Sequence, residues 1–197
     1  MGRYVEAAQV IRYMGENPED PVLRADVEFH IAVAEDLVDQ YCRCQMDLRE
    51  GEEIYLSGND SAILVPREYI LVIDTVEVVD EDDEVLDTLD CVIMPDNPRF
   101  GSGRWIERRD GLTFPEGRKN IKITGDLGFA TVPTQLAYCV HLVIRSLFQR
   151  RQINDFIAVE SGNGRLIQLK EEKDLDNYIP AMARKLLNQF KNSAGLA

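Results

Sequence analysis

The chain has 197 residues, of which 35 are acidic and 22 basic, so its formal charge at pH 7 is −13. This length is sufficient for one good hydrophobic core, or for a helical core with a small sheet inserted into it. The charge disfavours ordinary nucleic-acid binding, which requires lysine and arginine side chains against the phosphates. A protein with this charge has no charged partner, binds a basic partner, or lies close to a polyanion that it must not bind.

The sequence contains no recognisable targeting or membrane segment. Its first residues, Met1 to Glu6, lack the apolar stretch of a signal peptide. The strongest apolar run, from Leu136 to Ile144, is interrupted by His141 and is too short to span a bilayer. We therefore expect a soluble protein that stays where it is made and has no membrane partner.

The cysteines Cys42, Cys44, Cys91 and Cys139 do not suggest a disulfide framework in a chain of this length. The spacing of the first two differs from the C-x2-C spacing of a metal half-site, and no second pair follows. We expect buried or idle thiols, because a free cysteine behaves as a small hydrophobic residue. The sequence thus predicts neither a metal nor a cofactor.

Two helices are predicted before residue 51. The first covers Val5 to Met14 and ends at Gly15. The second begins at Asp20-Pro21 and is expected to continue to about Leu48. Its apolar residues alternate spacings of four and three, which predicts one buried face. That face contains Val27, Ile31, Ala34, Val38 and Tyr41, and the opposite, polar side contains Glu28, Glu35, Asp36, Asp39 and Gln40.

Between residues 52 and 124 the pattern changes to short alternating apolar runs separated by glycine and proline. These runs predict a small antiparallel sheet. The acidic segment Asp80–Glu84 is expected to be a solvated hairpin tip, because it lacks the glycine and the closing glutamate of a calcium loop. The expected strands are residues 53–58, 62–66, 71–79, 91–94, 104–107 and 120–124.

Pro133 opens a third helix, whose stripe is Leu136, Val140, Val143 and Leu147. A hairpin around Asn163-Gly164 is expected from residues 155–160 and 165–169. A final helix carries Ile179, Met182, Leu186 and Phe190 on one side. The fold class is therefore α+β: a small helical bundle with an inserted antiparallel β-sheet and a β-hairpin before the C-terminal helix. We expect residues 1–51 and 130–197 to form the bundle, and 52–129 the inserted sheet region.

No arrangement of residues predicts an active site. His30 and His141 are not paired with a serine or cysteine in a known order. The basic cluster Arg104, Arg108 and Arg109 suits nucleic acid, but the surrounding acidic charge argues against it. Two alternatives remain open. One is a carboxylate-based hydrolase, which requires a pocket with two convergent carboxylates of shifted pKa. The other is an acidic regulator that mimics DNA.

Several segments resemble the head–tail adaptor (connector) proteins of tailed bacteriophages. Residues 62–66 and 73–79 resemble the opening "L-L-P … V-x-S-V-x-V" of their strand insertion. Residues 117–133 resemble their signature "G-x-N-V-x-V-x-G-x-x-G-[WFY]-x-x-V-P", with Phe129 at the aromatic position, and residues 147–151 their basic "Y-x-R-R" helix end. The segment "I-x-x-A-E-x-x-I-D-x-Y" is matched by Ile31, Ala34, Glu35, Val38, Asp39 and Tyr41. The insertion here is longer than in the compact members.

The resemblance implies a structural virion protein rather than an enzyme. Such proteins, made in the host cytoplasm, form a ring, typically dodecameric, beneath the portal protein. The ring extends the DNA channel at the neck and meets the next neck or tail-completion protein. DNA passes without specific binding, which an acidic lumen favours. A different neck or tail-completion (stopper) protein is the alternative. Those proteins are richer in strand, so a helical fraction near or above the strand fraction favours the adaptor.

The resemblance also implies where partners bind. The C-terminal helix and tail of such proteins contact the portal, which here implicates Phe190, Lys191, Asn192, Ser193, Leu196 and Ala197. Inter-subunit or channel-lining loops are expected at Arg104, Arg108, Arg109, Asp82 and Asp83.

Overall fold

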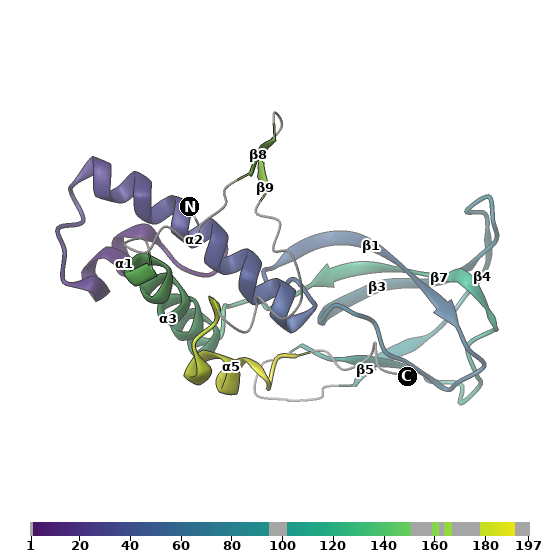
Figure 1. Ribbon diagram of the computed structural model, residues 1–197. Coiled ribbons are helices and arrows are strands. Elements are labelled where there is room, and N and C mark those ends of the chain that lie inside the picture. Colours follow the sequence, from purple (N-terminus) through teal and green to yellow (C-terminus); the bar gives the residue numbers. More distant parts are fainter. Residues whose placement is uncertain (1, 95–101, 151–158, 162–163, 167–177, 192–197) are drawn as a thin grey trace. The chain divides into compact units, whose positions relative to one another are not determined.

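The computed structural model describes residues 2–94, 102–150, 159–161, 164–166 and 178–191. The chain divides into two compact units, which we describe separately. Met1–Arg43 and Thr134–Lys191 form the helical unit, and Cys44–Pro133 form the β unit. Most of the helices and strands of both units are labelled in Figure 1.

The helical unit contains α1 (Ala7–Met14), α2 (Pro21–Cys42), α3 (Thr134–Arg150) and α5 (Ala181–Leu187). A short antiparallel hairpin, β8 (Val159–Ser161) and β9 (Gly164–Leu166), lies between α3 and α5 in the sequence (Figure 1). The expected hairpin is therefore present, although residues 155–158, 162–163 and 167–169 lie outside the described part of the chain.

Helix α2 begins as expected and ends earlier than expected. The carboxylate of Asp20 accepts the backbone N–H groups of Val22 at 2.9 Å and Leu23 at 3.2 Å, which caps the first turn. The helix does not reach Leu48. Arg43 adopts a left-handed conformation (φ 61°), which terminates the helix after Cys42, and a strand begins six residues later.

The core of the helical unit forms where the apolar sides of these helices meet. The predicted stripe of α3 is confirmed, since Leu136, Val140, Val143 and Leu147 are fully buried. The stripe predicted for the last helix is partly wrong. Met182 is 58% exposed, and the buried positions are Ile179, Ala183, Leu187 and Phe190.

Two antiparallel sheets form the β unit. The larger sheet has the order β1 (Arg49–Gly58), β7 (Gly117–Leu127), β3 (Ile70–Val79), β4 (Val85–Thr88). The smaller has the order β2 (Ile63–Leu64), β6 (Trp105–Arg108), β5 (Cys91–Met94). Strand β4, at the end of the larger sheet, was not predicted. All four of its residues are exposed, so it lacks the apolar–polar alternation of a half-buried strand.

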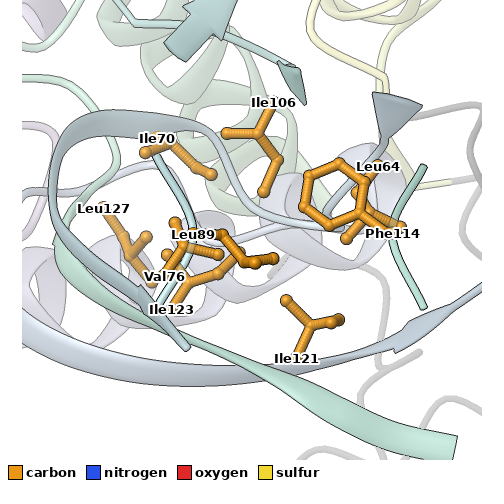
Figure 2. Packing of buried hydrophobic residues seen from close by; sticks show 9 residues of the cluster. All are labelled: Leu64, Ile70, Val76, Leu89, Ile106, Phe114, Ile121, Ile123 and Leu127. Atoms are coloured by element: carbon orange, nitrogen blue, oxygen red, sulfur yellow. The ribbon is translucent and has the colours of Figure 1, made fainter. Parts of the chain in front are cut away.

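One hydrophobic core serves both sheets. Figure 2 shows its nine buried side chains gathered between the strands. Burial of a side chain as large as a leucine or phenylalanine contributes roughly 1.5–3 kcal/mol, so this cluster is the main source of stability in the unit. Its members are Leu64, Ile70, Val76, Leu89, Ile106, Phe114, Ile121, Ile123 and Leu127. The predicted α+β class, with a helical bundle interrupted by antiparallel strands, is confirmed.

Candidate functional site

The signature that resembles the adaptor family covers β7 and the turn after it, and this turn is tied to several segments of the β unit. Gly128 donates its N–H to the carbonyl of Tyr69 at 2.8 Å, and its own carbonyl accepts the hydroxyl of Ser102 at 2.7 Å. The N–H of Phe129 reaches the carbonyl of Met46 at 3.1 Å. The Phe129 ring is fully buried and packs 4.6 Å from the ring of Tyr69. The signature therefore has a structural role in closing the β unit.

Glu35 in α2 is buried, contrary to the expectation that it lies on the polar side of the helix. Its side chain is 3% exposed. Its carboxylate accepts the backbone N–H groups of Arg3 at 3.0 Å, Tyr4 at 2.7 Å and Val5 at 3.4 Å. Three donors from the N-terminal segment thus compensate the desolvation of the carboxylate.

The next carboxylates along α2 hold the side chains of the same segment. The Arg3 guanidinium lies 2.7 Å from carboxylate oxygens of both Asp36 and Asp39, and the Tyr4 hydroxyl donates to Asp39. Burial acts to lower the pKa of Arg3, but Asp39, Tyr4, Asp36 and Glu35 outweigh this effect and raise it. The Glu35 and Asp39 of the family-like segment therefore anchor the N-terminal residues.

The acidic tip between β3 and β4 is ordered by its own carboxylates. Asp80 Oδ1 accepts the N–H groups of Asp82 and Glu84, both at 2.9 Å. Asp83 adopts a left-handed conformation (φ 62°). Its carboxylate accepts the hydroxyl of Tyr55 at 3.1 Å, and Lys122 Nζ lies 3.4 Å away. Asp83 is therefore tied to β1 and β7, whereas Asp82 is exposed on the tip.

Lys122 connects that tip to the sheet. Its ammonium group lies 3.2 Å from the carboxylate of Glu53, and its side chain is 15% exposed. The hydrogen bond with Glu53 is the main cause of a raised pKa at Lys122, together with the Tyr55 hydroxyl and Asp83, against the opposing effect of burial. The lysine therefore stays protonated at neutral pH and neutralises part of the acidic surface.

Arg104 and Arg108 are engaged inside the β unit. The Arg104 guanidinium carbon lies 4.7 Å above the Tyr69 ring, and its Nε donates to the Tyr69 hydroxyl at 3.0 Å. Arg108 forms a two-point ion pair with Asp110 and donates to the carbonyl of Thr113 at 2.9 Å. The hydrogen bond from Arg108 is also the main cause of the lowered pKa of Asp110. These contacts leave little positive charge for phosphate groups.

Arg109 is more open than its two neighbours. Its side chain is 61% exposed, and its guanidinium lies 3.5 Å from a carboxylate oxygen of Asp90. The structure thus does not assemble the three arginines into a basic surface, since each is matched with an acidic or aromatic side chain. Across residues 44–133 there are 20 acidic and 9 basic residues, so the β unit carries a formal charge of −11 out of −13.

The described chain ends on the helical unit. The Phe190 side chain is fully buried, so it serves as an internal anchor. Lys191 Nζ lies 4.8 Å above the ring of Tyr41, whose hydroxyl donates to the side-chain oxygen of Asn188 at 2.7 Å. Of the residues expected to contact a portal, Asn192, Ser193, Leu196 and Ala197 lie outside the described residues. The point from which they continue is held against α2.

The two histidines occupy structural positions. His30 Nδ1 is 2.7 Å from the carbonyl of Asp26, and its ring packs 4.4 Å from that of Phe148. His141 packs 5.2 Å from the Tyr13 ring, and burial lowers its pKa.

Thiols and possible metal ligands do not assemble into a site in the described part of the chain. Cys42 and Cys139 are buried and point their sulfur atoms at the carbonyls of Leu187 and Ala183, at 3.9 and 3.8 Å. Burial raises the pKa of Cys139 to about 12. The described residues do not gather three or more histidine, cysteine or acidic side chains suited to a metal ion. Within the same residues, every helix is too short or too polar to cross a bilayer.

Solved structures of gene transfer agent particles contain chains with a similar fold. One, described as the neck of an empty gene transfer agent (GTA) particle computed with C6 symmetry, matches with a TM-score of 0.60 and 13% identity, over 98% of this chain and 91% of that chain. Another, described as the virion of a native GTA particle, matches with a TM-score of 0.57 and 13% identity, over 96% and 90%. No protein-family model matches the chain, and no curated protein matches it in sequence. At this level of identity the likeness establishes the fold.

Proposed function

We propose that this protein is a structural, non-enzymatic component of the virion neck, a head–tail adaptor. In this proposal, copies of the chain form a ring, dodecameric as in the adaptor family, beneath the portal protein. The ring extends the DNA channel and links the capsid to the next neck or tail-completion protein. The observation that carries the proposal is the fold match over 98% of this chain to a chain of a GTA particle neck.

The division of charge supports a role around passing DNA. The β unit carries −11 of the total charge, and Arg104, Arg108 and Arg109 are matched with acidic or aromatic partners. An acidic lumen repels phosphates, so DNA slides through without being held. We therefore propose that the loop containing Asp82 and Asp83 lies near the channel, at the boundary between neighbouring subunits. Arg109, 61% exposed, is the arginine of the cluster best placed to reach a neighbour.

The secondary structure favours the adaptor over a stopper or tail-completion protein. Helices and strands cover about equal shares of the described residues, whereas stoppers are expected to be rich in strand. We further propose that residues 192–197 contact the portal, with the buried Phe190 and the Lys191–Tyr41 contact fixing the start of this tail.

The test is to mix the purified protein with portal assemblies from the same genome and to image the product by electron microscopy. We expect an added symmetric layer, coaxial with the portal channel, whose symmetry gives the number of subunits. Absence of this layer, together with binding to isolated tail components, would contradict the adaptor role and favour the stopper alternative.

A further inference from the structure

The turn and strand at the end of the larger sheet form an exposed surface that is predominantly acidic, although Lys122 lies beside Asp83 and Arg109 beside Asp90. Residues 80–90, which we call the acidic edge, contain seven acidic residues and no lysine or arginine. Within it, β4 is the terminal strand of its sheet and presents Val85 and Leu86, which are 53% and 66% exposed. Acidic residues normally protect an edge strand from aggregation, but two adjacent exposed apolar side chains do not serve that purpose.

The helical unit carries a surface of the opposite kind. Neither α3 nor α5 contains an acidic residue, while together they contain Arg145, Arg150, Arg184 and Lys185. The two helices pack together, with Gln189 donating to Gln135 at 2.7 Å and Cys139 pointing at the carbonyl of Ala183. We call this pair the basic helix pair.

The basic helix pair also exposes apolar side chains beside its charges. Met182 is 58% exposed and Tyr138 is 36% exposed. The side chains of Arg145 and Lys185 are exposed as well. Each of the two surfaces thus exposes two large apolar side chains. The charged residues of the first surface are acidic and those of the second are basic.

We infer that the acidic edge of one copy docks on the basic helix pair of the next copy. This inference rests on the proposed ring. Charge complementarity identifies the occupant. Two acidic edges repel each other, so a symmetric contact through β4 is unfavourable, whereas the head-to-tail contact places every acidic edge against basic side chains. A head-to-tail contact uses two different surfaces of each subunit, and it forms a closed ring when the rotation between neighbours divides a full turn evenly.

The contact can be tested by crosslinking two differently substituted preparations. One preparation carries Leu86→Cys and the other Met182→Cys. The two are mixed and treated with a short bismaleimide, which joins two thiols. The reaction is carried out on free protein at high concentration and on portal assemblies. Three native cysteines are buried, and burial raises the pKa of the half-buried Cys91 to about 11, which suppresses its reaction near pH 7. The matched control replaces Met182→Cys with Val22→Cys, a position that is 73% exposed and outside both surfaces.

We expect covalent dimers in the 86–182 mixture at about tenfold the level of the 86–22 control, because oriented charged surfaces raise the local concentration of the paired thiols. Reversing Glu81, Glu84 and Asp87 to lysine should remove this excess, and adding Arg145→Glu with Lys185→Glu to the other preparation should restore it. All five side chains are exposed, so the variants should keep the wild-type melting temperature.

Three results would overturn the inference. The first is equal crosslinking in the mixture and the control. The second is preferential dimerisation of Leu86→Cys with itself, which indicates a symmetric edge contact. The third is a chain carrying both cysteines that crosslinks within itself while the mixture does not. A coaxial layer on the portal without the 86–182 crosslink rejects this contact and retains the adaptor role. If the 86–182 crosslink forms in free protein but no layer forms on the portal, this contact is retained and the adaptor role is rejected.

Discussion

The carboxylate of Glu35 accepts the backbone N–H of Tyr4 at 2.7 Å, across 31 positions of the sequence. The same carboxylate binds the N–H groups of Arg3 and Val5, so the N-terminal segment is held by one buried side chain of α2. Gly2 fits the same arrangement, since a Cβ there would lie 2.6 Å from a methyl group of Ile31. The helical unit therefore depends on an interaction that α2 alone does not reveal.

Replacing Glu35 with alanine is expected to lower the free energy of unfolding by about 3 kcal/mol, because it leaves buried backbone donors without an acceptor. Asp36→Ala is the matched control. Its side chain is 69% exposed, and loss of its ion pair with Arg3 should cost only about 0.5 kcal/mol. Urea denaturation at neutral pH measures both. Equal losses in the two variants would show that Glu35 does not hold the segment.

The hydrophobic pattern of the sequence predicts much of this fold, because apolar spacing reports which side of an element is buried. The stripe of α3 and strand β5 follow directly from it. The pattern fails where a charged group is buried by partners distant in the sequence, as at Glu35. It also fails where backbone conformation ends an element, as at Arg43, whose positive φ no residue type there announces.

The interaction surfaces are harder to predict than the core. Strand β4 has no buried side, so neither alternation nor apolar content indicates it. The cluster of arginines appears basic in the sequence, but Arg104 and Arg108 are bound to Tyr69 and Asp110 once the chain folds. A cluster of arginines in the sequence therefore does not by itself predict a basic surface. The charge that a partner can reach depends on which arginines form contacts within the folded chain.

Gly128 in the family-like signature should tolerate no side chain. Its φ is 88°, and an added Cβ would lie 2.0 Å from the carbonyl oxygen of Asp47. We expect Gly128→Ala to lower the free energy of unfolding by about 3 kcal/mol or more, from a strained backbone plus a clash with another backbone segment. Gly111→Ala separates the two effects. Gly111 also has a positive φ, 72°, but has open space around the added atom, so its cost should be about 1 kcal/mol. Thermal melting of both variants gives the comparison, and similar melting temperatures would contradict the clash.

His141 should make stability depend on pH. Burial lowers its pKa in the folded protein, while the unfolded chain takes up a proton near the ordinary value of about 6.5. The stabilising contribution is therefore present above about pH 6.5 and is lost as the pH falls toward the folded-state pKa. Between about pH 7 and 5, we expect the free energy of unfolding of the wild type to fall more steeply than that of His141→Asn. This difference in slope is independent of any difference in stability between the two proteins at about pH 8. Parallel curves from urea denaturation would show that His141 is not the titrating group.

The proposed portal contact of the C-terminal tail can be tested separately from folding. Deleting residues 192–197 retains Phe190, whose side chain is fully buried, and Lys191, which lies over the Tyr41 ring. The shortened chain should therefore melt at the wild-type temperature while no longer adding a layer to the portal. Phe190→Ala is the contrasting variant, expected to cost about 3–5 kcal/mol because it leaves a cavity in the helical unit. If the shortened chain forms the layer as the wild type does, the portal contact lies elsewhere on the molecule, because a tail that is absent cannot supply it.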